Sequence, residues 1–401
     1  MPDRWRLFSL GELCERVRTK NDSGVNIVLS VVAGVGLVEQ EKYFNKRVAA
    51  KNLSGYTLIE TGTFVYNKSY STGAPQGVIT VNRERASGVV SPLYIAFRPN
   101  NPNIDSLFLE LAVLSAQTTK SLSSLVKEGG RAHGAINISI GDFFSVLVPL
   151  PPLAEQRRIV DLVGAIDACI GALETQIEAT RTARAGVLAE LLSTPGDDWQ
   201  TTTLGEVADV VSGGTPKTKV PEYWGGDVVW VTPTEVVANN GRYIYDSARK
   251  ITELGLDNSS AKILPKETVL LTSRATIGAV ALAGCQLATN QGFASLVCGP
   301  QMLSKFAMYW CQANTSEFVS RAGGNTFLEI SRRKVALIPL SLPPLAEQRR
   351  IVDLVGAIDA CIDALEVQVE ADRIARAGVL AELLSGEHRL PESYDKFVEA
   401  S

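Results

Sequence analysis

Apolar residues recur at alternating steps of four and three along two stretches of this 401-residue chain. The positions are Ile159, Val163, Ile166, Ile170, Leu173 and Ile177 in the first stretch, and Ile351, Val355, Ile358, Ile362, Leu365 and Val369 in the second. This spacing is typical of the a and d positions of a heptad, which lie on one face of an α-helix. Good helix formers fill residues 154–192, directly after a Pro-Pro pair that a helix interior would not tolerate. The pattern therefore predicts two long helices whose apolar seams pack on another helix.

The two helical stretches are near copies of each other. Residues 151–193 and 343–385 differ at only five of 43 positions, which are Gly171/Asp363, Thr175/Val367, Ile177/Val369, Thr180/Asp372 and Thr182/Ile374. Upstream the likeness survives only in fragments, such as Trp5 and Trp199. The chain is thus two tandem halves, each a globular part followed by a repeated helix. Thr180 and Arg184 interrupt the first seam, and Val187 with Leu191 is expected to resume it.

The globular parts mix both kinds of secondary structure. Short β-rich runs such as 62–66 and 227–232 alternate with Gly, Pro and Asn, while 106–114 and 303–313 are typical of helices. The fold class predicted is α+β (mixed α/β), with two globular domains separated by two long helices in a pseudo-twofold tandem repeat. The predicted boundaries are 1–150 for the first domain, 151–193 for the first helix, 194–198 for a linker, 199–342 for the second domain, 343–385 for the second helix and 386–401 for a tail.

The formal net charge of the whole chain, −4, argues against a nucleic-acid partner, but this sum hides an uneven distribution of charge along the chain. Residues 1–150 contain 16 Lys and Arg against 12 Asp and Glu, and residues 199–342 contain 13 against 11. The helical parts and the tail are acidic. This segregation favours a polyanion as the partner of the globular parts. The helices are almost unchanged between the two halves, whereas the globular parts have diverged. We therefore expect both helices to have the same function, and the two domains to have different functions of the same kind.

Several classes of protein fit the sequence poorly. No apolar run approaches the ~18–20 residues of a membrane span, and the first residues lack the pattern of a secretory signal, so a cytoplasmic location without a membrane partner is expected. The six Cys form no C-x-x-C pair and there are only two His, so no metal site is expected. Neither the Asn/Asp-Pro-Pro-Tyr/Phe motif of adenine methyltransferases nor a G-x-x-x-x-G-K-[ST] phosphate loop occurs. We therefore expect no catalytic residue and no cofactor in this chain.

A family resemblance rests on motifs that cover essentially the whole chain. The string LPPLAEQRRIVDLV occurs twice, starting at Leu150 and at Leu342. Other stretches that contribute to the resemblance lie in the globular parts, at 213–236, 272–282 and 288–293 in the second half and at 62–73 and 87–97 in the first. With this layout, the sequence resembles the DNA specificity (S) subunit of type I restriction–modification systems.

The resemblance implies a non-catalytic DNA-binding subunit. Its two target recognition domains would each read one half of a bipartite, asymmetric site in double-stranded DNA. Its helices would pack antiparallel as a coiled-coil spacer and dock two methyltransferase (modification) subunits, which bind S-adenosylmethionine. A restriction/translocase subunit that uses ATP and Mg²⁺ can join, so that the whole complex is an adenine-specific DNA methyltransferase and an ATP-dependent endonuclease. Two alternatives stay open: the specificity subunit of a related fused restriction–methylation enzyme, and a coiled-coil adaptor without DNA binding.

Candidate DNA-contacting residues are polar side chains in loop-like surroundings. They are Lys68, Tyr70, Arg131, Lys217, Lys219, Arg274, Asn290, Gln291, Arg321 and Asn325. Basic side chains neutralise phosphates, and an amide can make two hydrogen bonds to adenine. For each of them, a solvated surface charge or a structural amide is the alternative interpretation. Trp224, Trp230 and Trp310 are expected in domain cores.

If the helices set the distance between the two half-sites, lengthening both by one heptad will change the recognised gap. Insertion of seven residues after Ile170 and after Ile362 preserves the seam and adds about 10 Å of helix. That length corresponds to roughly three base pairs. We expect a site whose gap grows by a few base pairs, or loss of activity through misphasing, with both half-sequences unchanged wherever methylation survives. Methylome sequencing measures the gap, and an active variant with the original gap would show that the helices are not the ruler.

Overall fold

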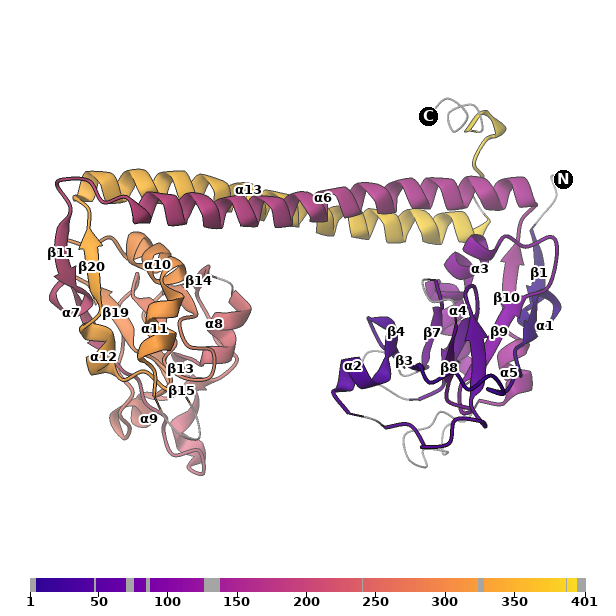
Figure 1. Ribbon diagram of the computed structural model, residues 1–401, viewed down its shortest axis with the longest axis horizontal. Helices are drawn as coiled ribbons and strands as arrows, with labels where there is room; N and C mark the ends of the chain where they lie inside the picture. The colour runs from indigo at the N-terminus through magenta and orange to yellow at the C-terminus, as the bar shows by residue number, and fades with distance from the viewer. Residues whose placement is uncertain are drawn as a thin grey trace. The chain divides into compact units, whose positions relative to one another are not determined.

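The computed structural model describes residues 5–46, 48–69, 76–83, 87–125, 138–239, 241–323, 328–386 and 388–394. The chain divides into two compact units. The first unit comprises Met1–Leu173 and Gln368–Ser401, and the second comprises Glu174–Val367. Each unit holds one globular domain, part of the long helix α6 (Leu153–Ser193) and part of the long helix α13 (Leu345–Ser385). The predicted mixed fold with two domains and two long helices is confirmed (Figure 1).

The first unit contains the domain that precedes α6. Its elements are β1 (Arg6–Ser9), α1 (Leu10–Leu13), β2 (Cys14–Arg16), β3 (Val28–Val32), β4 (Gly36–Glu39), α2 (Gln40–Phe44), β5 (Thr57–Glu60), β6 (Phe64–Asn67), β7 (Val78–Val81), β8 (Ser87–Val90), β9 (Ile95–Pro99), α3 (Ser106–Val113), α4 (Ala116–Leu125), α5 (Ile140–Phe144), β10 (Leu147–Leu150) and the 3-10 turn η2 (Glu392–Tyr394). The strands form sheets in the orders β2-β9-β6-β7 and β4-β3-β8-β5, and β1 pairs with β10. All these pairs are antiparallel except β3 with β8.

The second unit contains the domain between the long helices. Its elements are β11 (Gln200–Thr203), α7 (Leu204–Val207), β12 (Ala208–Val211), the 3-10 turn η1 (Pro221–Tyr223), β13 (Trp224–Val231), α8 (Pro233–Asn239), β14 (Tyr243–Ile244), β15 (Lys250–Ile251), α9 (Glu253–Asp257), β16 (Val269–Leu271), β17 (Val280–Ala283), β18 (Ala288–Thr289), β19 (Ser295–Cys298), α10 (Ser304–Ala313), α11 (Thr315–Arg321), α12 (Arg332–Ala336) and β20 (Pro339–Leu342). The sheet orders are β12-β19-β16-β17-β14 and β15-β13-β18, and β11 pairs with β20. The parallel pairs are β13 with β18 and β14 with β17.

The two domains share part of their topology in spite of their divergent sequences. In the first domain, β2 pairs with β9, which pairs in turn with the hairpin of β6 and β7. In the second domain, β12 pairs with β19, which pairs with the hairpin of β16 and β17. The order β2-β9-β6-β7 therefore corresponds to β12-β19-β16-β17. The parallel pair β3 with β8 of the first domain corresponds to β13 with β18 of the second, which has a further parallel pair, β14 with β17. Both first helices carry a capping box, built by Ser9 with Glu12 and by Thr203 with Glu206. The second domain differs by the insertion of α8 between β13 and β14.

Each long helix contributes to the core of the domain in its unit. In the first unit, Ile159 and Val163 of α6 and Leu383 and Leu384 of α13 join the buried cluster that contains Phe108. In the second unit, Leu188 of α6 and Ile351 and Val355 of α13 join the cluster around Phe306. Each compact unit therefore includes parts of both helices, whereas the sequence boundaries treated the helices as separate segments. Within the described residues, no helix is long and apolar enough to cross a membrane.

The repeated Pro-Pro-Leu-Ala-Glu-Gln string ties each helix start to its domain through the glutamine. The Gln156 side chain is fully buried; its Oε1 accepts a hydrogen bond from the backbone N–H of Asp105 at 2.8 Å. Its Nε2 donates to the carbonyls of Asn103 and Pro151, both at 2.8 Å. These bonds hold the N-terminal end of α3 against the first turn of α6.

The second unit repeats this arrangement atom for atom. Oε1 of the fully buried Gln348 accepts from the N–H of Leu303 at 2.8 Å, and its Nε2 donates to the carbonyls of Gln301 and Pro343, both at 2.8 Å. A buried amide that satisfies three backbone groups is expensive to replace, because each group left without a partner costs free energy.

Replacement of Gln348 by leucine should destabilise the second unit. Gln348→Leu leaves one N–H and two carbonyls without this partner, and we expect the free energy of unfolding to fall by about 2–4 kcal/mol in chemical denaturation. The matched control is Gln368→Leu on the exposed face of α13, which should change stability by no more than about 0.5 kcal/mol. Equal losses in the two variants would show that the buried hydrogen bonds contribute nothing particular.

Candidate nucleic-acid interface and paired helices

The twelve predicted seam residues all face inward. Ile159, Val163, Ile170, Ile177, Ile351, Val355, Ile362 and Val369 are buried, and Ile166, Leu173, Ile358 and Leu365 are half-buried. Beyond the interruption, Leu188 is the buried residue, whereas Val187 and Leu191 are only half-buried. Leu191 packs against the buried cluster that contains Leu188, so apolar contact resumes after the interruption, against the core of the second domain.

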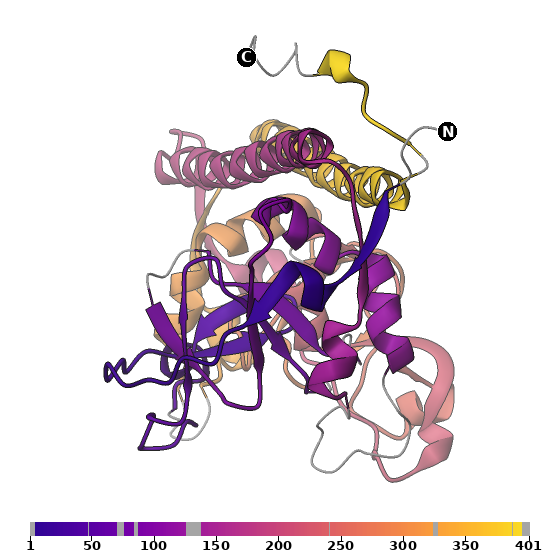
Figure 2. The same ribbon diagram turned by 90° about the vertical axis from the view of Figure 1, so that its right-hand side faces the viewer.

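In the second unit, the interruption of the seam is a polar contact between the helices. Arg184 of α6 binds Asp359 of α13 through Nε and Nη2, and its Nη2 also donates to Oε1 of Gln312 at 2.8 Å. The hydroxyl of Tyr309 donates to Oδ2 of Asp359 at 2.7 Å, and burial together with this carboxylate raises the pKa of Tyr309 above its usual range. Arg181, three residues before Arg184, contacts Glu366, seven residues after Asp359. The residue numbers of successive partners thus decrease along α6 and increase along α13. The helices are antiparallel here, and they lie side by side in both ribbon views (Figures 1 and 2).

The first unit contains the same contact with the two helices exchanged. Arg376 of α13 binds Asp167 of α6 through Nε and Nη2. Arg376 is the repeat of Arg184, and Asp167 is the repeat of Asp359. Each arginine thus pairs with the aspartate of the other copy, as the two-fold pairing of equivalent helices requires. A polar residue at a seam position specifies register, because a shifted alignment would bury its charge without a partner.

Three loops of the second domain join into one surface. The turn at 212–217 is bonded to the loop at 290–293 through the N–H of Gly214, which donates to the carbonyl of Thr289 at 2.9 Å. The loop at 272–276 is attached by the N–H of Ser273, which donates to Gly292 at 2.8 Å. At Gly213 a Cβ atom would lie 2.1 Å from the Thr289 carbonyl oxygen, so the close approach of the first two loops requires glycine there. The surface is a candidate nucleic-acid interface.

The predicted residues of the second domain fall into two groups on or beside this surface. Lys217 and Lys219 are exposed on the first turn, and Gln291 is exposed and accepts a hydrogen bond from the Thr215 hydroxyl. The other three are engaged within the chain. The Asn290 Oδ1 accepts from the N–H of Gly292 at 2.8 Å, Arg274 forms an ion pair with Glu329 at 2.8 Å, and Arg321 forms one with Glu317 at 3.0 Å. Of these candidates, Lys217 and Lys219 are exposed without such a partner in the described residues, and Gln291 is exposed but bonded through its Oε1.

A further cation beside this surface was missed from the sequence. The guanidinium carbon of Arg249 lies 3.7 Å from the ring centroid of Trp224, and the Trp224 Nε1 donates to the carbonyl of Lys217 at 3.3 Å. Stacking on the indole holds the guanidinium in place while leaving its donors exposed. Trp230 and Trp310 are buried as predicted, whereas Trp224 is half-buried: its ring packs edge-on against Trp230 at the margin of a core cluster and carries Arg249 on its face. Nothing in the local sequence links Arg249 with a tryptophan 25 residues earlier.

The strand registers relate the loops of the first domain to those of the second. Phe64 of β6 faces Phe97, as Val269 of β16 faces Leu296, and this correspondence places Lys68 one position before the equivalent of Arg274. Lys68 is half-buried directly after β6. The two candidates, chosen from unrelated stretches of sequence, thus lie on equivalent loops. Tyr70, Arg131 and Asn325 lie outside the described residues, and among the described residues no group of three or more His, Cys, Asp or Glu side chains could hold a metal ion.

Comparison with known proteins identifies the family. The family model described as "Type I restriction modification DNA specificity domain" matches residues 2–180 and 196–371, one copy for each half. The chain belongs to this family. It is a specificity subunit of a type I restriction–modification system, in agreement with the resemblance of its repeated motif.

Individual relatives agree with this assignment. The specificity subunit of the type I restriction enzyme MjaIX from Methanocaldococcus jannaschii is 36% identical over 175 residues. The match covers 43% of this chain and 40% of that relative, so it spans less than half of the relative's length. The MjaVIII specificity subunit of the same organism is 20% identical over 97% of this chain and 94% of its own. A solved structure from work on complex assembly and conformational transition of the type I R-M system has a TM-score of 0.64 at 21% identity, covering 96% of this chain and 98% of its own. This last likeness supports the fold.

Breaking the contact between Arg184 and Asp359 should loosen the helix pair in the second unit. Arg184→Met leaves a partly buried carboxylate with only Tyr309 as partner, and we expect a loss of about 1–3 kcal/mol in the free energy of unfolding. In a double-mutant cycle with Asp359→Asn, the coupling energy should be about 0.5–2 kcal/mol. Native-state hydrogen exchange in the second half of α6 measures both quantities. Arg349→Met, on the exposed face of α13, is the control, and a coupling energy near zero would contradict a specific pair.

Proposed function

We propose that this specificity subunit reads a bipartite, asymmetric site in double-stranded DNA, one half with each globular domain. The joined loops of the second domain support this proposal, because they present Lys217 and the exposed amide of Gln291. The exposed Lys219 follows directly, and Arg249 stacks on Trp224, which is bonded to the first turn. Cations that bind phosphates position a protein on DNA, and side chains that reach base edges specify sequence. The two domains share part of their topology but differ in their loops, as expected for two readers of different sequences.

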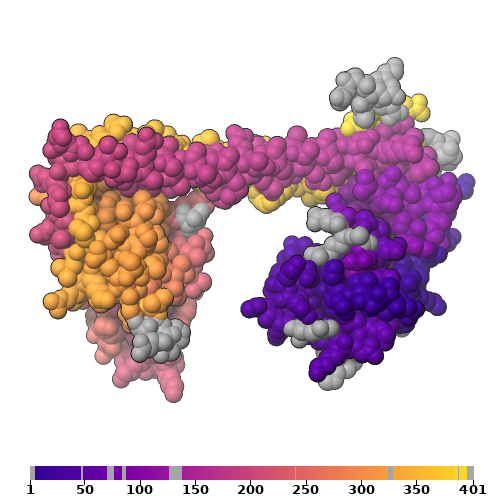
Figure 3. All heavy atoms as spheres, viewed as in Figure 1, coloured from indigo at the N-terminus to yellow at the C-terminus, as the bar shows by residue number. Residues whose placement is uncertain are grey.

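We further propose that α6 and α13 dock two methyltransferase subunits. The observation that carries this proposal is the identity of exposed residues in the two helices, including Arg157 with Arg349, Asp161 with Asp353 and Gln176 with Gln368. Packing explains identity at buried positions, but a substitution on a bare surface is usually neutral. A partner that binds both helices in the same way accounts for identity on their solvent-facing sides, which include the long exposed face of α6 in Figure 3.

Catalysis is assigned to the partners. The methyltransferase subunits would bind S-adenosylmethionine, and a restriction/translocase subunit would bind ATP and Mg²⁺ and join through them. This chain would then supply recognition and geometry. The resulting complex would methylate adenine and cleave DNA in an ATP-dependent reaction. A fused restriction–methylation enzyme would use the same recognition chain, and the composition of the purified complex distinguishes the two cases.

Methylome sequencing of cells that express this chain with its methyltransferase tests the proposal. We expect methylation at two short sequences separated by a constant gap, and none at that motif without this chain. Replacement of residues 1–150 by the corresponding domain of another specificity subunit should change one half of the motif and leave the other unchanged. Methylation by the purified chain alone, or a motif altered in both halves, would contradict the assignment of roles. Salt-dependent retention of the complex on DNA is expected, and absence of retention at low salt would favour an adaptor without DNA binding.

A further inference from the structure

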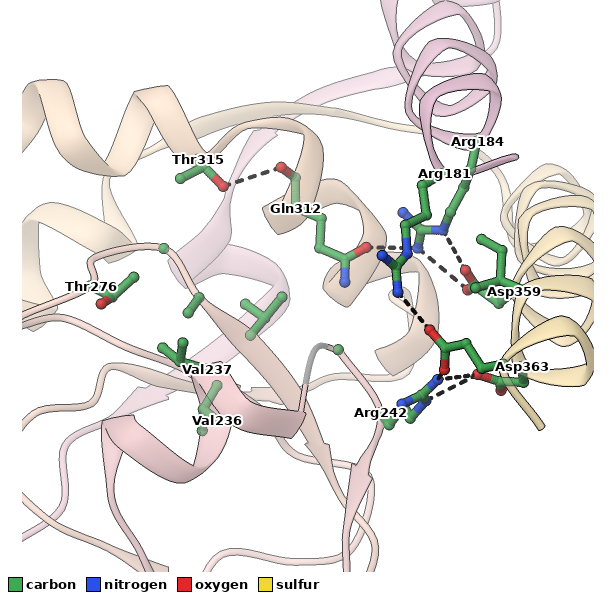
Figure 4. Close-up of a pocket in the computed structure, with 16 residues that line it drawn as sticks. Arg181, Arg184, Val236, Val237, Arg242, Thr276, Gln312, Thr315, Asp359 and Asp363 are labelled. Carbon is green, nitrogen blue, oxygen red and sulfur yellow. Dashed lines mark hydrogen bonds and ion pairs between the residues drawn. The ribbon is translucent and has the colours of Figure 1, made fainter. Parts of the chain in front are cut away.

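An arginine of the second domain contacts the helix α13 on the side of a cavity of about 500 Å³. The Arg242 Nε donates to Oδ1 of Asp363 at 3.0 Å, and its Nη2 contacts both Asp363 and Glu366. Arg181 of α6 approaches Glu366 from the other side, with its Nη2 at 2.6 Å from Oε1. In Figure 4 the arginine side chains converge on the carboxylates of α13. The contact links the domain directly with its supporting helices inside the second unit.

The backbone before Arg242 is built for this approach. Gly241 has a φ of +82°, a conformation that other residues adopt only with strain. A Cβ atom at Gly241 would also lie 2.5 Å from Nε2 of Gln312. On the other side, the Arg242 carbonyl accepts from the N–H of Leu282, which attaches the residue to the edge of the sheet. The turn therefore presents Arg242 to α13 from a defined position.

The two halves of the sequence differ at this contact. The repeat of Asp363 is Gly171, one of only five differences between the helical copies. The strand β3 corresponds to β13 by its parallel partner, and the chain leaves β3 through the short turn Ala33-Gly34-Val35, which contains neither a helix nor a charged residue. The carboxylate is thus absent from the first helical copy, and the described turn after β3 offers no arginine. This difference indicates that Asp363 serves the second domain and not the pairing of the helices, which the two copies share.

The electrostatics make the contact moderate in strength. The side chains of Arg242 and Asp363 are about half exposed, so each ion pair by itself contributes little. Burial would raise the pKa of the Glu366 carboxyl, but hydrogen bonds from Arg242 and Arg181 outweigh burial and hold that pKa below its usual value. A network of two arginines and two carboxylates is more directional than a single pair, because Arg242 bridges two carboxylates from one turn of α13.

We propose that Arg242 and Asp363 form a positioning contact particular to the second target recognition domain, which sets the orientation of that domain on α13 and thereby the presentation of its loops to DNA. The inference rests on the proposed DNA-reading function. It concerns positioning, since neither residue belongs to the joined loops at 212–217, 272–276 and 290–293.

Discrimination measured separately for the two half-sites tests this inference. With the complete methyltransferase complex, the rate of methylation is compared between the recognised site and sites with one substitution in either half. Arg242→Gln and Asp363→Ala should each lower discrimination at the half read by the second domain by about five-fold, and leave the other half unchanged. The double charge reversal Arg242→Asp with Asp363→Arg should restore most of the loss. Gly171→Asp, which adds the carboxylate where no arginine corresponds to Arg242, is the matched control and should change neither half.

Each outcome bears on the inference. An equal loss at both half-sites, no loss at either, or a loss that charge reversal fails to restore would overturn it. Because Asp363 is half exposed, Asp363→Ala keeps the test informative if Arg242→Gln unfolds the domain, and melting temperatures identify that case. If the unaltered complex itself shows no sequence discrimination, the proposed function fails independently of this contact.

Discussion

The seam on each 41-residue helix cannot remain in water, and most of the architecture follows from where that apolar surface is buried. An isolated helix with so narrow an apolar face needs a partner. The antiparallel partner helix supplies one side, and the core of the adjoining domain supplies the other, around Phe108 in the first unit and Phe306 in the second. Each domain and its helix segments are consequently one folding unit.

Polar side chains decide the alignment that apolar contacts alone leave open. Leucine and isoleucine seams tolerate shifted registers, whereas the pairs Arg184 with Asp359 and Arg376 with Asp167 match in one antiparallel alignment. Gln156 and Gln348 perform a related task at the helix starts, where each satisfies three backbone groups. The most recognisable string of the sequence is thus explained in part by a structural amide.

The two domains combine a common framework with different loops. Shared strand orders keep the loops after β6 and β16 in equivalent places, so one scaffold carries loops of different sequence. The inserted α8 and the turn at Gly241 add a contact with α13 that has no equivalent in the first half. Near-identical helices therefore carry domains that are attached in different ways. The position occupied by Gly171 in α6 and by Asp363 in α13 is one where the two attachments differ.

The sequence by itself determined the tandem repeat, the long helices, their seam and the family, because heptad spacing and a repeated motif are local and periodic signals. It also indicated Lys217 and Gln291 as exposed candidates. Only the tertiary structure decided that Arg274, Asn290 and Arg321 are engaged by partners within the chain, and that Arg249 stacks on Trp224. It likewise placed Leu188 in the buried core of the second domain, with Leu191 packed against it. These outcomes depend on contacts between segments far apart in sequence, whose partners no local pattern specifies.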